Sequence, residues 1–237
     1  MSVKTVLILA NSVRHWPNAC VAGREVIEHA GQRGFGAWVR PVSAHGEGEL
    51  SLLERTTSLG REVHVLDIVR MSLGEPVPDA LQPENWRHGG APPWDIVGQG
   101  TVEDLERASE TPLSIWDELG DRSDRIVEER AKQFPLTQSL LLLALESLAI
   151  ELSSEHYPER TRKQRRALFR YQNRNYRLSI TDPTIEARYG LQVPTPSEPA
   201  LTHHIGHQCF VCISLAHQPF HGHHYKLAAA IIDPEHL

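Results

Sequence analysis

The residues best suited to bind a ligand lie between Arg160 and Arg177, where cations and aromatic rings are interleaved. This segment has eight basic residues and no acidic one, whereas the other 16 basic residues of the chain face 30 acidic ones. Such an uneven charge distribution points to a polyanionic partner. Arginine binds phosphate and stacks on flat rings, and aromatic side chains stack on unpaired bases. The segment therefore predicts contact with single-stranded nucleic acid or a nucleotide.

These residues lie on both arms of a predicted β-hairpin. The turn is placed at Asn173–Asn175, because Asn tolerates a positive φ angle. Phe169 and Tyr171 share one face of the strand, since alternate residues do so. Basic residues would hold phosphates and aromatic ones would stack on bases. The predicted nucleic-acid-binding residues are Arg162, Lys163, Arg165, Arg166, Phe169, Arg170, Tyr171, Arg174, Tyr176 and Arg177.

A second interpretation of the hairpin stays open. Phe169 and Tyr171 would then face the core, and the arginines would pair with the many acidic residues of the chain. The same cations would also suit an acidic protein partner. The sequence alone does not decide between a surface that grips nucleic acid and the solvated outside of a hairpin.

Cysteine and histidine residues form two further groups with reactive side chains. Cys209 and Cys212 have the spacing of zinc ligands or of a redox pair. The apolar residues around them predict a strand, on which positions three apart face opposite sides. We therefore expect two buried thiols, no metal and no cofactor. Seven of the 14 histidines lie between His203 and His224, and we interpret them as residues of loops.

Six polar residues at the ends of predicted N-terminal strands form a second candidate site. Cys20 is a candidate nucleophile with His15 close by in the sequence, although no common catalytic or phosphate-binding motif is present. The set suits a nucleotide or the end of a nucleic acid, and it equally suits the building of turns. These pocket candidates are Asn11, Ser12, Cys20, Arg24, Arg40 and Ser43.

The hydrophobic pattern predicts a chain of short strands with a few helices. Apolar or alternating runs predict strands at residues 4–10, 36–43 and 61–73. Thr101 can cap a short helix over 101–110. Ser139–Ser153 is rich in Leu, Ala and Glu, which favours a helix, although two strands joined near Glu146 also fit. The sum is a β-rich protein of small barrels or sandwiches.

Length and composition limit the cellular context. A chain of 237 residues allows one large domain or two small ones. No apolar run is long enough to cross a bilayer, and the N-terminal apolar run is too short for a signal peptide. Three cysteines do not suggest a disulfide framework. We expect a cytoplasmic protein with no membrane partner.

Seven short pieces of the chain, taken in order, resemble the dual OB-containing domain of bacterial proteins. The pair CVAGREV and WVRPVS is the most specific of them, and the set extends from Lys4 to Ile232. The pieces are KTVLILANS, CVAGREV, WVRPVS, VLDIVRMSL, PENW, YRLSITDP and SLAHQPFHGHHYKLAAAII. Some proteins with this domain are linked to defence or conflict loci.

The resemblance implies a mainly β chain of two OB-like small β-barrels packed together. The first barrel would cover residues 1–110 and the second 139–237, with 111–138 as a connector. A strand pair would replace the helix at Ser139–Ser153. Because OB barrels commonly bind oligonucleotides, the resemblance favours a non-enzymatic nucleic-acid or nucleotide-binding module, in a bacterial defence system. The alternatives are a protein-interaction subunit and a nucleotide-processing enzyme that uses Cys20 or the His-rich loop.

Overall fold

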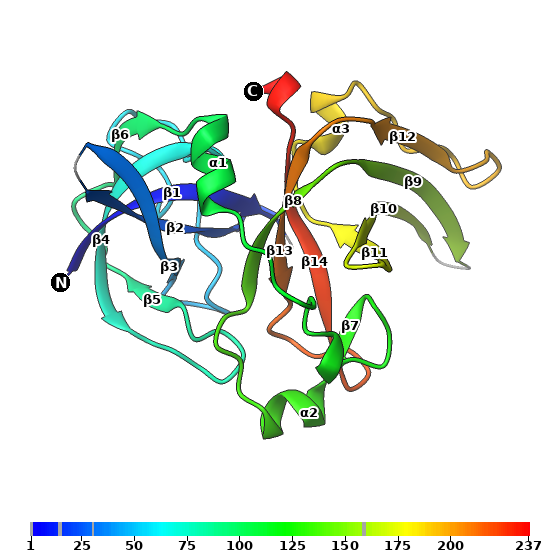
Figure 1. The fold of residues 1–237 in the computed structure, drawn as a ribbon, viewed down its shortest axis with the longest axis horizontal. Coiled ribbons are helices and arrows are strands. Elements are labelled where there is room, and N and C mark those ends of the chain that lie inside the picture. The colour runs from blue at the N-terminus through cyan, green and yellow to red at the C-terminus, as the bar shows by residue number, and fades with distance from the viewer. Residues whose placement is uncertain (1, 14–15, 30, 158–159) are drawn as a thin grey trace. The chain divides into compact units, whose positions relative to one another are not determined.

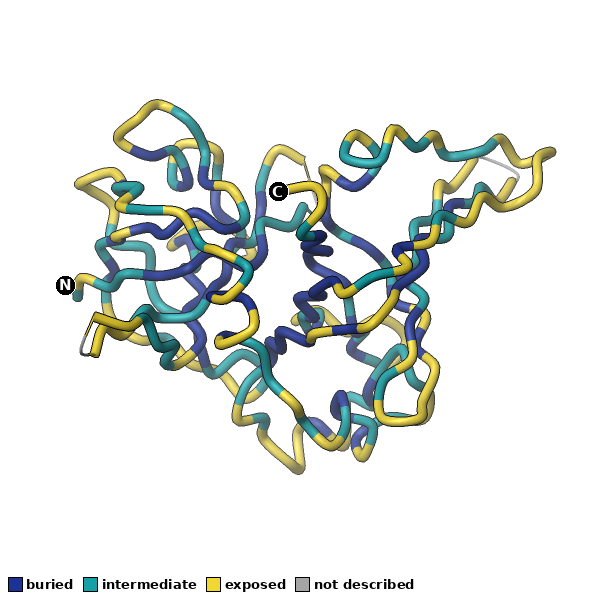
Figure 2. The backbone as a smooth tube through the Cα atoms, turned by 45° about the horizontal axis from the view of Figure 1, so that its top comes forward, coloured by how far each residue is buried: buried dark blue, intermediate teal, exposed yellow. Residues whose placement is uncertain are grey.

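The computed structural model describes residues 2–13, 16–29, 31–157 and 160–237, and strands dominate it (Figure 1). The chain divides into two compact units, each with its own curled sheet. The first unit comprises Met1–Glu110 and Phe134–Leu142, and the second comprises Thr111–Gln133 and Leu143–Leu237. Figure 2 shows that buried positions gather inside each unit while exposed positions mark the turns. None of the helices in the described ranges is long and apolar enough to span a membrane.

The first unit is a closed five-stranded barrel with one added strand and one helix. Its elements are β1 (Ser2–Ser12), β2 (Cys20–His29), β3 (Gln32–Val42), β4 (Asp67–Pro76), β5 (Asn85–His88), β6 (Asp95–Gln99) and α1 (Val102–Ala108). The strands pair in the order β1-β2-β3-β5-β4, and β4 pairs back with β1. The β3–β5 pair is parallel. This order and this parallel pair are those of an OB barrel.

Alternation along the strands fills the interior of the first barrel. Val6 and Ile8 of β1, Val21 of β2 and Val39 of β3 belong to one buried core cluster. Their neighbours in sequence point to the outside, because successive side chains of a strand face opposite sides. After β6, Thr101 caps α1 through a reciprocal pair of hydrogen bonds with Asp104, as the sequence predicts.

The second unit holds the remaining elements. The strands are β7 (Arg125–Val127), β8 (Leu140–Leu145), β9 (Leu148–Tyr157), β10 (Arg160–Tyr171), β11 (Arg174–Ile180), β12 (Leu201–Ile205), β13 (Cys209–Leu215) and β14 (His223–Ile232), and the helices are η1 (Asp117–Leu119), α2 (Glu128–Gln133), α3 (Ile185–Arg188) and η2 (Pro234–His236). The boundary between the units falls within β8, after Leu142. The strand order is β12-β9-β10-β11-β14-β13-β8, with β7 on β14.

Strands β8 and β9 are two halves of one bent strand that closes the second barrel. Only Glu146 and Ser147 separate them. β8 pairs with β13, and β9 pairs with β10. Counted as one strand, they restore the order of the first barrel, and β11 and β14 form the matching parallel pair. The second unit is therefore also OB-like, and β10 and β11 are its second and third strands.

Residues 139–153 form strands, not the helix that their composition favours. The segment forms β8 and the first part of β9, as the resemblance implies. Leu140 to Leu143 are all buried. Differences in helix propensity amount to about 0.7 kcal/mol per residue or less for ordinary residues, so pairing with β13 and β10 outweighs them.

The segment 111–138 is divided between the units instead of forming a separate connector. Its first part belongs to the second unit, where Asp117 accepts hydrogen bonds from Tyr176 and Lys226. Its last part belongs to the first unit, where the Gln138 amide donates to Glu110 at 2.9 Å. Polar residues in this segment therefore anchor the chain to the two barrels.

Two predicted strand boundaries also differ. β4 begins at Asp67, not at residue 61. The Asp67 carboxylate accepts from both Arg61 terminal nitrogens, at 2.8 and 2.9 Å, and from the His64 backbone N–H at 2.8 Å. These bonds hold residues 61–66 in a turn. The hairpin turn lies at Gln172 and Asn173, whose φ angles are 46° and 62°.

Candidate nucleic-acid interface

The hairpin of β10 and β11 has one face inside the second barrel and one outside. Phe169 and Tyr176 are cross-strand partners with stacked rings whose centroids lie 5.2 Å apart. They are only 6% and 2% exposed. Both rings fill the barrel interior with Ala167 and Leu178. The stacking role expected of Phe169 and Tyr176 is therefore corrected, because neither ring is open to a base.

Three other predicted contact residues share this inward-facing row near its ends. The Tyr171 hydroxyl donates to the Pro112 carbonyl at 2.7 Å. Arg174 lies 3.2 Å from an Asp117 oxygen, and Arg165 pairs with Glu186. Their side chains thus serve the second unit itself. Lys163 follows on the same row and is exposed.

The outward face carries the remaining arginines. Arg162, Arg166 and Arg170 lie at every fourth position of β10 and so share one face, and Arg177 is the cross-strand partner of Leu168 on that face. Arg166 is half-buried, and the other three are exposed. Among the described side chains on the outward face of β9, β10 and β11, there are two carboxylates, Glu151 and Glu155, beside these four cations.

Arg166 is held in place by uncharged partners. Its guanidinium donates to the Ser179 hydroxyl and, at 3.1 and 3.3 Å, to the side-chain oxygen of Gln164. Burial lowers its pKa, and the charges of Arg177 and Arg162 lower it further. Asp124 and Glu155 act in the opposite direction, with smaller effects. Arg166 is therefore a fixed cation beside two other cations.

The acidic residues of β9 offset part of this charge. Glu151 forms an ion pair with Arg177. Glu155 lies opposite Arg162 in the β9–β10 register. Arg177 is 53% exposed even within its pair, and exposed ion pairs contribute little stability. A phosphate can therefore compete for Arg177.

The corresponding face of the first barrel is covered by its own chain. Leu7, Arg24 and Trp38 are cross-strand partners on the outward side of β1, β2 and β3. Leu7 is fully buried and Trp38 is 4% exposed, and α1 packs against β3. The Trp38 ring N–H donates to Glu110 at 3.1 Å. This face is closed to a long ligand.

Residues of the first unit's second segment lie over the end of β3. The Ser139 hydroxyl accepts from Arg40 at 3.1 Å, and the Ser139 backbone N–H donates to Glu84 at 3.2 Å. Arg40 also lies 3.1 Å from Glu84. All three side chains are buried, so Arg40 is a structural residue of the first barrel.

A pocket of about 250 Å³ remains beside this segment. Arg24 is its cationic lining residue, but the guanidinium donates to the carbonyls of Gly36 at 2.6 Å and Ala108 at 3.1 Å. Burial lowers the pKa of Arg24. An oxygen of Glu110 lies 3.6 Å from this guanidinium and offsets its charge, so the pocket offers little to an anion. Its lining residues are Arg24, Gly36, Ala37, Trp38, Pro83, Glu84, Trp86, Thr137 and Gln138.

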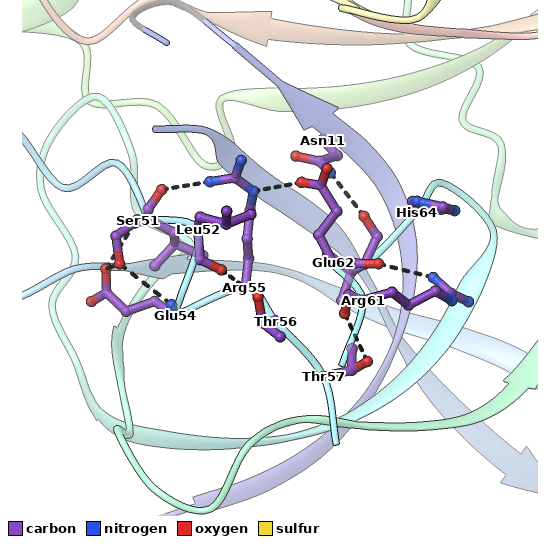
Figure 3. Close-up of polar contacts among 12 residues, drawn as sticks. Asn11, Ser51, Leu52, Glu54, Arg55, Thr56, Thr57, Arg61, Glu62 and His64 are labelled. Carbon is purple, nitrogen blue, oxygen red and sulfur yellow. Dashed lines mark hydrogen bonds and ion pairs between the residues drawn. The ribbon is translucent and has the colours of Figure 1, made fainter. Parts of the chain in front are cut away.

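The six N-terminal pocket candidates do not converge on one site. Asn11 donates to the Val63 carbonyl at 2.8 Å and points to the loop before β4 (Figure 3). In the same loop Arg55 is buried and donates to Glu62 at 2.8 Å. Asn11 therefore anchors a loop.

The other candidates are equally dispersed. Ser12 and Cys20 are cross-strand partners at the ends of β1 and β2, and His15 lies outside the described residues. Ser43 donates to Glu54 at 2.7 Å, beside a separate open pocket of about 600 Å³. Arg24 and Arg40 have the contacts given above. The structure thus favours the turn-building interpretation of this set.

The side chains of Cys209 and Cys212 are fully buried. Burial raises the pKa of Cys209 to about 12, so it is not a thiolate at neutral pH. Within the described part of the chain, no group of three or more His, Cys, Asp or Glu side chains is arranged to hold a metal ion.

The histidines expected in loops lie partly on strands: His203 and His204 belong to β12, and His223 and His224 to β14. Several histidines have structural partners. His207 contacts one oxygen of Asp233 at 2.7 Å, and His236 contacts the other at 3.0 Å. The Tyr189 hydroxyl donates to Asp233 at 2.8 Å. Asp233 is 1% exposed, and these hydrogen bonds hold its pKa at about 2 despite burial. The cluster fixes η2 to the second barrel.

The model of the dual OB-containing domain family matches residues 4–231. No curated protein and no solved structure matches the chain. The matched region covers nearly all of both units, and each unit has the strand order expected of an OB-like barrel. The chain therefore belongs to the dual OB-containing domain family.

Proposed function

We propose that the second barrel binds single-stranded nucleic acid or a nucleotide on the outward face of β10 and β11. OB barrels bind oligonucleotides on the face of their second and third strands. β10 and β11 hold these positions in the second barrel, and arginines are in excess on that face. A role in bacterial defence and a cytoplasmic location stay predictions from the sequence.

The environment of Arg166 is the observation that carries the proposal. Burial and the neighbouring charges of Arg177 and Arg162 disfavour its charged form. A bound phosphate relieves this repulsion and adds charge-assisted hydrogen bonds. Because Gln164 and Ser179 already fix the guanidinium, little side-chain entropy is lost on binding.

A comparison with the first barrel also favours the second barrel as the binding unit. Its outward β2–β3 face holds Trp38 and Arg40, which are 4% and 5% exposed. Residues 102–110 and 134–142 occupy the place that a ligand takes on an OB barrel. The second barrel leaves Arg162, Arg170 and Arg177 exposed on its equivalent face. The first barrel is thus a structural unit and the second a binding unit.

A salt titration tests the proposal. We expect a fluorescently labelled 12-nucleotide oligothymidine to bind at 50 mM salt in an anisotropy assay. With three or four phosphates neutralised, log affinity falls against log salt with a slope of about −2 to −3 for a single strand. That slope gives a loss of about 15- to 60-fold between 50 and 200 mM salt. Absent binding at 50 mM, or binding that salt does not weaken, contradicts the proposal.

A further inference from the structure

The loop between β13 and β14 presents an aromatic ring to solvent. The backbone N–H groups and carbonyls of Phe220 and His223 pair at 2.8 and 3.2 Å. They close a two-residue turn at His221 and Gly222, whose φ angles are 49° and 73°. Two positive φ angles are typical of a tight type I′ hairpin turn. The Phe220 side chain is nevertheless 61% exposed, so an apolar ring beside a tight turn faces water.

The ring of Tyr225 lies next to Phe220, on the part of β14 that pairs with β7. The ring centroids of Phe220 and Tyr225 are 6.3 Å apart. Tyr225 is partly exposed on β14, whereas the next residue, Lys226, is buried inside the barrel. The guanidinium of Arg125 on β7, which pairs with β14 (Figure 1), lies 5.8 Å from the Tyr225 ring and donates to its hydroxyl at 3.1 Å.

Neighbouring charges connect these rings with the arginines of the hairpin. Asp124 lies 4.0 Å from Arg125 and is also one of the groups that raise the pKa of Arg166. Asp121 pairs with Arg125 at 3.1 Å. The two carboxylates more than offset the charge of Arg125. Of the surface from Phe220 to Arg166, the Phe220 end therefore offers flat rings and only the Arg166 end offers positive charge.

A ligand that contacts both ends must be longer than one nucleotide. Phe220 lies beside Tyr225 of β14, and Arg125 contacts Tyr225. Two residues after Tyr225, Leu227 pairs with Ser179 of β11, and the Ser179 hydroxyl accepts from Arg166. The loop that joins the fourth and fifth strands also contributes to oligonucleotide binding in OB barrels. In the second barrel that loop carries Phe220.

We propose that the ligand of the second barrel is a single-stranded polynucleotide, not a free nucleotide, and that one of its bases stacks on Phe220. This inference rests on the proposed function and adds a ligand class and a residue to it. Phosphates lie on Arg162, Arg166 and Arg177, and the strand continues past Arg125 and Tyr225 to the Phe220 ring. Base stacking tolerates any sequence because every base has a flat face.

A length series with a matched pair of variants tests this inference. The probes are thymidine monophosphate and oligothymidines of 4, 8 and 12 nucleotides, measured by competition anisotropy at 50 mM salt. The variants are Phe220→Ala, Phe220→Trp and, as the control, Phe134→Ala, which removes an equally exposed ring from the first unit. Because Phe220 is exposed at a loop tip, we expect the Phe220→Ala variant to stay folded, and circular dichroism checks this.

We expect affinity to rise more than tenfold from the monophosphate to the 12-mer. Loss of one stacked base predicts that Phe220→Ala weakens 12-mer binding about 5- to 100-fold, while Phe220→Trp and Phe134→Ala retain it. Monophosphate binding is unchanged by all three variants. Equal affinity for the monophosphate and the 12-mer overturns the polynucleotide assignment, and wild-type affinity of Phe220→Ala for the 12-mer overturns the stacking on Phe220. Either result leaves the proposed function standing. If no probe binds, both this inference and the proposed function fail.

Discussion

Replacing Asp117 with Ala destabilises the second barrel by about 3–5 kcal/mol, the usual cost of leaving a buried charge without its partner. Lys226 is 1% exposed, and its amino group donates to Asp117 at 2.7 Å. Tyr176 and Arg174 also contact this carboxylate. For a unit of this size the loss lowers the unfolding midpoint by about 10–20 °C, which differential scanning calorimetry measures.

A double variant separates the lost charge pair from a general loss of packing. Lys226→Met removes the buried cation, so Asp117→Ala with Lys226→Met is expected to be more stable than Asp117→Ala alone. Asp121→Ala is the matched control, since its ion pair with Arg125 is partly exposed and contributes at most about 1 kcal/mol. A wild-type midpoint for Asp117→Ala, or no rescue by Lys226→Met, would show that the pair does not hold this barrel together.

Replacing Arg166 and Arg177 together with Ala is expected to weaken 12-mer binding about 10- to 100-fold at 50 mM salt. Each removed phosphate contact makes the slope of log affinity against log salt less steep by about 0.7 for a single strand. The slope of the double variant is therefore expected to be less steep than that of the wild type by about 1.4. The measurement is the anisotropy titration of the wild type and the variant at several salt concentrations.

Arg165→Ala is the control for this pair of arginines. It removes one positive charge from β10, the strand that carries Arg166, but Arg165 lies on the other face and pairs with Glu186. The wild-type salt slope is expected to persist in Arg165→Ala. If Arg165→Ala weakens binding as much as the double variant does, net charge decides affinity and the outward face has no special role.

Strand periodicity predicted the hairpin but did not settle which face is buried. Alternation groups Phe169 with Ala167 and Tyr171, yet both faces of β10 mix apolar and basic residues. The stronger signal was in β11, where Tyr176, Leu178 and Ile180 form an apolar row opposite Arg177 and Ser179. That row places Tyr176 inside, and the hairpin register then places Phe169 beside it.

Contacts between distant segments decided the rest of the candidate site. The outward face of β2 and β3 is covered because Glu110, Ser139 and Glu84 bind its side chains. Local pattern cannot predict that residues 44 to 99 positions apart meet. Phe220 was missed for another reason: among many histidines it looks like a loop residue, and the sequence does not show that a tight turn with two positive φ angles follows it.

Hydrogen–deuterium exchange of the whole chain, with and without the oligothymidine 12-mer, tests most directly whether the second barrel is the binding unit. We expect slower amide exchange in peptides that cover residues 162–179 and the loop 216–222, with no change in β2 and β3. Protection confined to the first unit, or exchange unchanged in β10 and β11 under conditions where the 12-mer is bound, would contradict it.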